Sequence, residues 1–271
     1  MTTAMVIFTD LDGTLLDRTT YSFDTARNAL AELRQRKIPL ILVSSKTRAE
    51  IEPIRVQLEN DHPFIVENGG AVVIPDDYFT FPLNEAVDRH GDEVIELGRP
   101  YSQLRRALKD IQQFLGKELR GYGDMSVDEV VSRTGLSQEE ARLSMQREYD
   151  EPFVMEGSDD RLIREVKKRG LRYTKGGRFH HLMGPHDKGR AVRQLIDCYR
   201  RSIGEGHGGP MTVAIGDSLN DLPMLEAVDR PILVQLTDGS YEPGIEIPRL
   251  TLAPGPGPTG WNIAVHALLQ E

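Results

Sequence analysis

The stretch VIFTDLDGTLLD, residues 6–17, places two carboxylates directly after a short apolar run. The run Val6–Phe8 predicts a buried strand, and the Gly-Thr pair a few residues later predicts the turn that follows it. Asp10 and Asp12 therefore stand at the end of a strand. Aspartate is common in turns because it hydrogen-bonds its own backbone, whereas a carboxylate pair carries out chemistry only when other groups complete a site. The remaining sequence discriminates between these two interpretations.

The composition is that of an ordinary globular chain, and its 271 residues allow one domain with a large insertion or two domains. No apolar run approaches the roughly 20 residues of a membrane span, and the first predicted strand leaves no room for a signal peptide, so we expect a cytoplasmic protein with no membrane partner. The single cysteine, Cys198, excludes an internal disulfide framework. The net charge of -9 disfavours nucleic acid as a partner, so local Lys and Arg side chains must hold an anionic small molecule. Nothing in the composition predicts the oligomeric state.

Apolar runs and helical periodicity alternate at both ends of the chain. Strands are predicted at 39–45, 63–74, 211–217 and 230–236, and helices at 23–37, 47–59, 188–203 and 222–228. Strands and helices joined by short links predict right-handed crossovers, and hence an α/β fold with a Rossmann-like core, a parallel sheet with helices on both faces. The segment APGPGPTG, residues 253–260, predicts a rigid loop before a last helix that begins near Trp261.

The character of the sequence changes between these two halves. From residue 85 to residue 175, charged helical segments alternate with short strand-like pieces, which predicts an inserted α+β cap domain. The core domain then comprises residues 1–84 and 176–271. Ligands of open α/β sheets bind at the carboxyl ends of the strands, so a module inserted there can cover the site. The alternative is an independent domain elsewhere on the surface.

Polar side chains follow several predicted core strands or begin a core helix: Asp10, Asp12, Ser44, Lys188, Asp217 and Asp221. Each has a local explanation, as a helix cap, a solvated lysine or a turn rich in Asp and Gly. A parallel sheet, however, brings the four aspartates to one edge, where they cannot all ionise without compensation. Oxygen ligands in an incomplete cage suit Mg²⁺, which accepts phosphate oxygens as further ligands. Ser44 and Lys188 would then supply a hydrogen-bond donor and a positive charge to a phosphate group.

In this order, DLDGT (10–14), Ser44, Lys188 and GDSLND (216–221) resemble the four signature motifs of the haloacid dehalogenase superfamily. Members of that superfamily are mostly Mg²⁺-dependent phosphatases, and the insertion resembles the larger cap of its sugar-phosphatase branch. Within that branch the chain is similar to the mannosyl-3-phosphoglycerate phosphatase family over nearly its whole length, through SSKT (44–47), ENGG (67–70), REYDEPF (147–153), GGRFHHLMG (176–184) and GPTGW (257–261). Ser45 and Lys46 replace the Gly-Arg pair that is common in the wider branch, which favours the narrower family.

The resemblance implies separate roles for the two opening aspartates. Asp10 would attack phosphorus to form an aspartyl-phosphate, and Asp12 would protonate the departing alkoxide and then deprotonate the hydrolytic water. It also implies that Mg²⁺ is bound by the Asp10 carboxylate, the Asp12 backbone carbonyl and Asp217, with Asp221 as a further ligand or a support for the ligands. The expected reaction is hydrolysis of mannosyl-3-phosphoglycerate to mannosylglycerate and phosphate.

Four further residues are candidates for substrate binding. Lys46 and Asn68 follow strands near the site, although ENGG is equally explained as a strand-end turn. In the cap, strand alternation places Arg178 and His180 on one face and Phe179 on the other. An arginine fork suits a glyceryl carboxylate, so we expect Arg178, with His180, to hold the carboxylate or the sugar. The alternative is that both lie on a solvated face of the cap sheet.

Three other functions are compatible with the same motifs. One is hydrolysis of glucosyl-3-phosphoglycerate or another sugar phosphate, since no residue distinguishes the epimers. Another is a mutase that returns the phosphoryl group to a sugar. The third, a non-catalytic phosphate-binding regulator, is disfavoured because such a sensor needs neither Asp10 nor Asp12.

Overall fold

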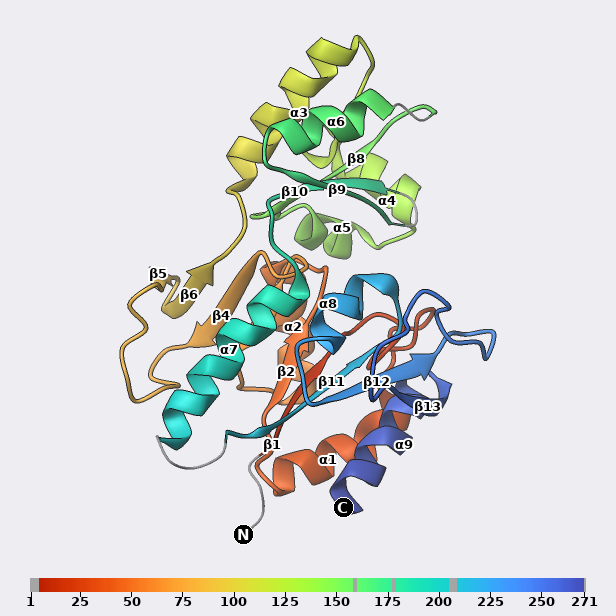
Figure 1. The fold of residues 1–271 in the computed structure, drawn as a ribbon. Helices are drawn as coiled ribbons and strands as arrows, with labels where there is room; N and C mark the ends of the chain where they lie inside the picture. The colour runs from red at the N-terminus through yellow and green to blue at the C-terminus, as the bar shows by residue number, and fades with distance from the viewer. Residues whose placement is uncertain (1–4, 158–159, 177–178, 205–208, 271) are drawn as a thin grey trace.

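The computed structural model describes residues 5–157, 160–176, 179–204 and 209–270, which form two stacked parts (Figure 1). One part is built on a sheet of nine strands and the other on a sheet of four. In spatial order the large sheet consists of β13 (Thr251–Pro256), β12 (Arg230–Gln235), β11 (Met211–Gly216), β1 (Met5–Thr9), β2 (Leu40–Val43), β3 (Phe64–Val66), β4 (Ala71–Pro75), β6 (Asp92–Glu96) and β5 (Val87–Arg89). Over the described residues, no helix combines the length and apolar character that a membrane crossing requires.

The strands from β13 to β3 run parallel, and β4, β6 and β5 continue the sheet antiparallel. The first strand lies between segments from both ends of the chain, because Ile7 pairs with Val213 of β11 on one side and Leu40 of β2 on the other. The expected α/β fold with a mostly parallel sheet is thus confirmed.

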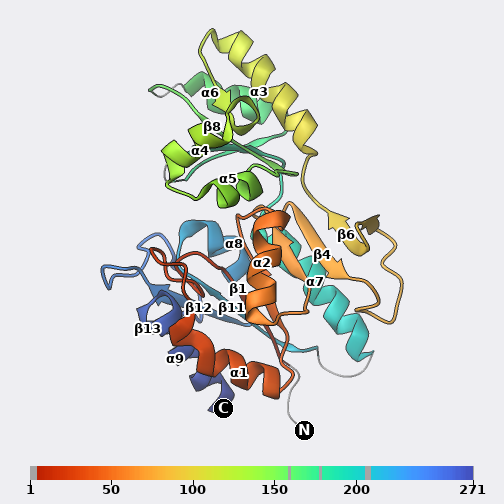
Figure 2. The same ribbon diagram turned by 180° about the vertical axis from the view of Figure 1, so that it is seen from behind.

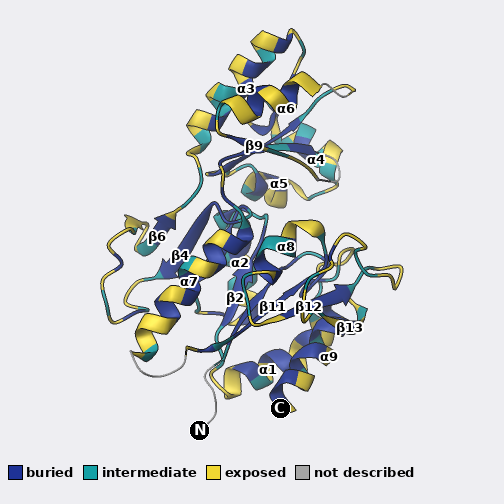
Figure 3. Ribbon diagram, viewed as in Figure 1, coloured by how far each residue is buried: buried dark blue, intermediate teal, exposed yellow. Residues whose placement is uncertain are grey.

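Helices cover both faces of the large sheet (Figure 2). The helices on one face are α1 (Arg27–Gln35), with the short η1 (Asp24–Ala26) before it, α2 (Arg48–Leu58) and α9 (Gly257–Gln270); those on the other are α7 (Lys188–Ile203) and α8 (Leu222–Leu225), with η3 (Leu219–Asp221) before it. Alternation along β1 explains this arrangement. Ile7 packs in the layer under α1, α2 and α9, and Val6 and Phe8 pack in the layer under α7 and α8. Figure 3 shows both layers of buried residues flanking the strands.

The small sheet has the antiparallel order β7 (Arg120–Gly121), β8 (Asp150–Val154), β10 (Phe179–Met183) and β9 (Arg172–Gly176). The helices α3 (Tyr101–Leu115) and α6 (Asp160–Lys168) pack on one face of it. The other face carries η2 (Tyr122–Asp124), α4 (Val127–Thr134) and α5 (Gln138–Ser144), and α5 lies on the side of the large sheet (Figures 1 and 2).

The change from one sheet to the other does not fall at residues 85 and 175, where we expected the insertion to begin and end. The hairpin of β5 and β6 extends the large sheet, and β10 is a central strand of the small sheet. The hairpin turns at His90 and Gly91, both with positive φ, which is typical of a two-residue turn between antiparallel strands. Half of the residues in this hairpin are charged, and charged residues are also frequent in the insertion that follows, so the sequence alone assigned the hairpin to the insertion.

The Pro- and Gly-rich segment near the C-terminus is also a correction. Residues 251–256 form the edge strand β13, and α9 begins at Gly257 rather than near Trp261. Proline is tolerated at an edge strand because the missing N–H costs no pairing on the open side.

Candidate active site

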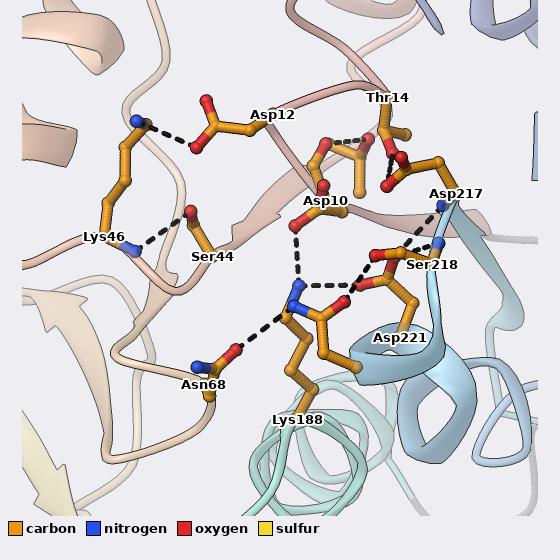
Figure 4. Close-up of polar contacts among 12 residues, drawn as sticks. Asp10, Asp12, Thr14, Ser44, Lys46, Asn68, Lys188, Asp217, Ser218 and Asp221 are labelled. Atoms are coloured by element: carbon orange, nitrogen blue, oxygen red, sulfur yellow. Dashed lines mark hydrogen bonds and ion pairs between the residues drawn. The ribbon is translucent and has the colours of Figure 1, made fainter. Parts of the chain in front are cut away.

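The carboxyl ends of β1 and β11 bring Asp10 and Asp217 to the same edge of the large sheet (Figure 4). Trp261 of the GPTGW segment supports this end of β1, because its Nε1 donates to Thr9 Oγ1 at 3.0 Å. Carboxylate oxygens of Asp10, Asp217 and Asp221 all lie within 4.8 Å of one another, and all three residues are buried. The structure therefore brings these predicted site residues together.

Lys188 enters this acidic cluster from the first turn of α7. Its Nζ donates to Asp10 Oδ1 and Asp221 Oδ1, each at 2.6 Å, and its side chain is fully buried. Burial opposes the charge of Lys188, but the two aspartates outweigh it and raise the pKa of the ammonium. Burial raises the pKa of Asp10 to about 8, with Lys188 opposing the shift and the neighbouring carboxylates adding to it. Three carboxylates meet two positive side chains, Lys188 and Arg18, and oxygen ligands gathered this closely suit a divalent cation.

Asp221 orients the turn that carries Asp217. Its Oδ2 accepts from the backbone N–H of Asp217 at 3.0 Å and of the next residue at 3.1 Å. The Asp217 carboxylate also accepts from two donors that were not among the predicted site residues: Thr14 Oγ1 of the DLDGT motif at 3.3 Å and Arg18 Nη2 at 2.8 Å. Burial and the Asp221 charge raise the pKa of Asp217, while Arg18 opposes that shift. Arg18 follows the first motif closely, but its loop position gave no periodic signal.

Asp12 lies on the other side of Asp10 from this cluster (Figure 4). Its Oδ2 lies 2.9 Å from Lys46 Nζ, and its Oδ1 is buried with no hydrogen-bond partner in the described part of the chain. Burial opposes the charge of Lys46, but Asp12 and Glu50 raise the pKa of this ammonium. Asp12 thus offers a carboxyl oxygen that no group among the described residues binds.

Ser44 and Asn68 stand at the ends of β2 and β3. Ser44 is buried; its Oγ accepts from Lys46 N at 3.2 Å, and its carbonyl accepts from Asn68 N at 2.9 Å. At Gly69, whose φ is 93°, a Cβ would lie 2.2 Å from the Asp187 carbonyl, so glycine is required beside α7. ENGG is therefore a tight turn, and the same turn places Asn68 beside the site (Figure 4).

The two residues predicted on the cap sheet have different outcomes. Arg178 lies outside the described residues. His180 is a correction: its Nδ1 lies 2.6 Å from the Tyr173 hydroxyl and its ring stacks on Phe153 at 5.3 Å, within the layer under α3 and α6. That layer lies on the face of the small sheet away from the large sheet (Figure 1). Because helices cover both faces, alternation alone did not identify the side toward the core.

The predicted site residues did not include the side chains that join the two parts. Arg147, which is buried, donates from Nη1 to Ser45 O at 3.0 Å. The Glu67 carboxylate accepts from the backbone N–H groups of Glu148 and Tyr149 at 2.8 and 3.0 Å. These contacts fasten the segment before β8 to the ends of β2 and β3. Arg147 lies in REYDEPF and Glu67 in ENGG, but neither motif indicates that its charged residue binds a segment far away along the chain.

The fold and the site define a class of protein. Residues 7–90 match the model of a family described as haloacid dehalogenase-like hydrolase. A solved structure from Thermoplasma acidophilum matches with a TM-score of 0.69 and 17% identity, covering 99% of this chain and 100% of that one. This likeness concerns the fold, and it includes the cap as well as the core.

Sequence relatives extend the match to the whole chain. A glucosyl-3-phosphoglycerate/mannosyl-3-phosphoglycerate phosphatase of Methanococcoides burtonii is 48% identical over 98% of this chain and 97% of that protein. A mannosyl-3-phosphoglycerate phosphatase of Pyrococcus horikoshii is 38% identical over 84% of this chain and 90% of that protein. The chain therefore belongs to the haloacid dehalogenase-like hydrolases and, within them, to the family of these phosphoglycerate phosphatases. The family predicted from the motifs is confirmed.

Proposed function

We propose that this chain is a phosphatase that hydrolyses mannosyl-3-phosphoglycerate, and also its glucosyl counterpart, to the glycosylglycerate and inorganic phosphate. The relative from Methanococcoides burtonii, named for both substrates, supports this choice. The observation that carries the proposal is the position of Asp10, which bonds Lys188 in the buried cluster while the pair of Asp12 and Lys46 lies on its other side. This arrangement separates a nucleophile from an acid.

In the first half of the reaction, an oxygen of Asp10 attacks phosphorus in line. The bond between phosphorus and the glyceryl oxygen breaks as Asp12 protonates that oxygen. Lys188, held 2.6 Å from Asp10, offsets negative charge on the phosphoryl group. Ser44, buried at the end of β2, donates its hydroxyl hydrogen to a phosphoryl oxygen.

In the second half, the deprotonated Asp12 takes a proton from a water molecule. The oxygen of that water attacks the phosphorus of the aspartyl-phosphate, the bond to Asp10 breaks, and phosphate leaves. Asp12 keeps the proton for the next turnover. One carboxyl therefore serves first as acid and then as base.

The acidic cluster fits Mg²⁺ as the cofactor. The groups that would hold it are the carboxylates of Asp10 and Asp217 and the backbone carbonyl of Asp12, with Asp221 adjacent. When bound, the ion supplies the positive charge that lets an anionic nucleophile approach an anionic ester. Asp221 has a second task, since its two oxygens hold Lys188 and the turn of Asp217.

Phosphate release from a panel of esters tests this function. The panel contains both glycosyl-3-phosphoglycerates, 3-phosphoglycerate and several hexose phosphates, each with Mg²⁺ and after exhaustive chelation. We expect the glycosylated phosphoglycerates to be hydrolysed fastest, chelation to abolish release, and added Mg²⁺ to restore it. Full activity after chelation would refute the metal assignment. Preference for a hexose phosphate would refute the substrate, and transfer of phosphate to a sugar instead of water would indicate a mutase.

A further inference from the structure

The loop after β1, residues 17–22, reaches both sides of the site. Asp17 shapes it: Oδ1 accepts from two backbone N–H groups of the loop at 3.0 and 2.8 Å. Arg18 extends from this loop to the acidic cluster. Tyr21 extends from it to the opposite side, where its ring lies near Lys46. The loop thus forms a wall of the site that belongs to the core.

Tyr21 is held in an uncommon conformation. Its φ is 55°, a region that bulky side chains rarely adopt, and its N–H donates to Asp17 O at 2.9 Å. The residue is 46% exposed, so burial of the ring does not account for the strained backbone. Strain of this kind is concentrated at ligand-binding sites, where it fixes a side chain in a required position.

The ring of Tyr21 lies next to the place that the leaving group must occupy. Lys46 Nζ is 5.1 Å from the centre of the ring and 2.9 Å from Asp12 Oδ2. In the proposed mechanism Asp12 protonates the glyceryl oxygen, so the glyceryl glycoside begins at Asp12 and passes Lys46. An ammonium has three N–H donors, so Lys46 can bind a substrate carboxylate without releasing Asp12. The exposed ring then presents an apolar face to the sugar.

We propose that Tyr21 is a specificity residue whose ring packs against the glycosyl ring of the substrate while Lys46 pairs with the glycerate carboxylate. This inference rests on the proposed function, because it requires a glycosylated leaving group. It assigns part of substrate selection to a core loop rather than to the cap alone.

Affinity measurements separate this role from turnover. In an Asp10→Asn background, calorimetry gives the Kd of mannosyl-3-phosphoglycerate and of 3-phosphoglycerate, which lacks the sugar. Tyr21→Gly removes the ring, and because glycine adopts a φ of 55° freely, the loop keeps its shape and the Tm does not fall. We expect the preference for the glycosylated ligand to fall about five- to tenfold. Tyr21→Phe retains the ring and should retain the preference.

Phe114→Ala is the matched control, since this aromatic residue is 58% exposed near the end of α3, and it should leave both affinities unchanged. Equal weakening of both ligands by Tyr21→Gly, or an unchanged preference, would overturn the inference and leave the proposed function standing. If the wild-type enzyme released phosphate from neither of the two glycosyl-3-phosphoglycerates, the proposed function would be overturned, and this inference with it.

Discussion

The two sides of the active site hold their charges differently. In the acidic cluster, the side chains of Lys188 and Asp221 are fully buried and bond each other directly. On the open side, the side chains of Asp12 and Lys46 are 35% and 14% exposed, and Tyr21 beside them is 46% exposed. Buried charges with several partners are in place before a substrate arrives, whereas exposed ones can adjust to it. In the proposed mechanism, the buried side carries the nucleophile Asp10, and the open side carries the acid Asp12 and the contacts to the leaving group.

The largest expected effect comes from the buried side. Asp10→Asn removes the nucleophile and one charge with almost no change in shape, so turnover should fall at least about a thousandfold while the substrate still binds. Phosphate release and calorimetric Kd measure the two quantities separately. Asp110→Asn, on an exposed position of α3, is the matched control and should behave as the wild type. Wild-type turnover by Asp10→Asn would rule out the aspartyl-phosphate.

Asp12→Asn tests the open side by the quality of the leaving group. A glyceryl alkoxide needs a proton, so we expect kcat on a glycosyl-3-phosphoglycerate to fall about 10²- to 10⁴-fold. The aryloxide of an activated aryl phosphate leaves without a proton, so the loss of kcat on that ester should be distinctly smaller. The measurement is the ratio of the two losses, which no general damage to the protein would change. Equal losses would argue against Asp12 as the acid.

The same division describes what could be predicted from the sequence. On the buried side, Asp10, Lys188 and Asp217 were identified because each follows a strongly apolar strand or begins a periodic helix, and parallel strands end at one edge. Arg18 on the buried side and Tyr21 on the open side were missed because both belong to a loop, where no periodicity indicates which side chain turns inward. Their roles depend on bonds to distant residues that only the folded chain brings near.

The core and the cap show a similar contrast. The core elements were predicted because their apolar runs are continuous, but the hairpin of β5 and β6 and the edge strand β13 lack such runs. In the cap, the alternation predicted for β10 was correct, but the face assigned to the substrate was wrong. His180 packs under helices on the outer face. Alternation distinguishes two faces of a strand, but when both are covered it does not say which one meets the substrate.

A moderate effect is expected from Lys46, which belongs to the open side. Lys46→Met removes the charge that we assign to the glycerate carboxylate, so kcat/KM for mannosyl-3-phosphoglycerate should fall about ten- to a hundredfold. Lys46→Arg retains a positive charge and should recover part of the loss. Steady-state kinetics on both variants gives the measurement. If Lys46→Met and Lys46→Arg lower kcat/KM by the same factor, the charge of Lys46 does not bind the substrate.

The smallest effect on catalysis, and a measurable one on stability, is expected where core and cap meet. Burial raises the pKa of Glu67 from an ordinary 4.5 to about 8, with Arg147 opposing the shift. Because the folded-state pKa lies above the unfolded one, the stabilisation from this group is complete below about pH 4.5 and is lost as the pH rises to about 8. Glutamine does not titrate, so the Tm of Glu67→Gln should vary less over this range.

At pH 5 the Glu67→Gln variant should be less stable than the wild type by about 1 to 3 kcal/mol, because its amide nitrogen cannot accept one of the two backbone N–H groups that the carboxyl oxygens bind. As the pH rises from 5 to 8, the wild type loses the contribution of Glu67 and the difference in Tm should shrink. Thermal unfolding of both proteins in Mg²⁺ at several pH values measures this convergence. Parallel curves would show that Glu67 keeps one protonation state throughout, and that its two backbone hydrogen bonds and Arg147 outweigh the cost of burying its charge.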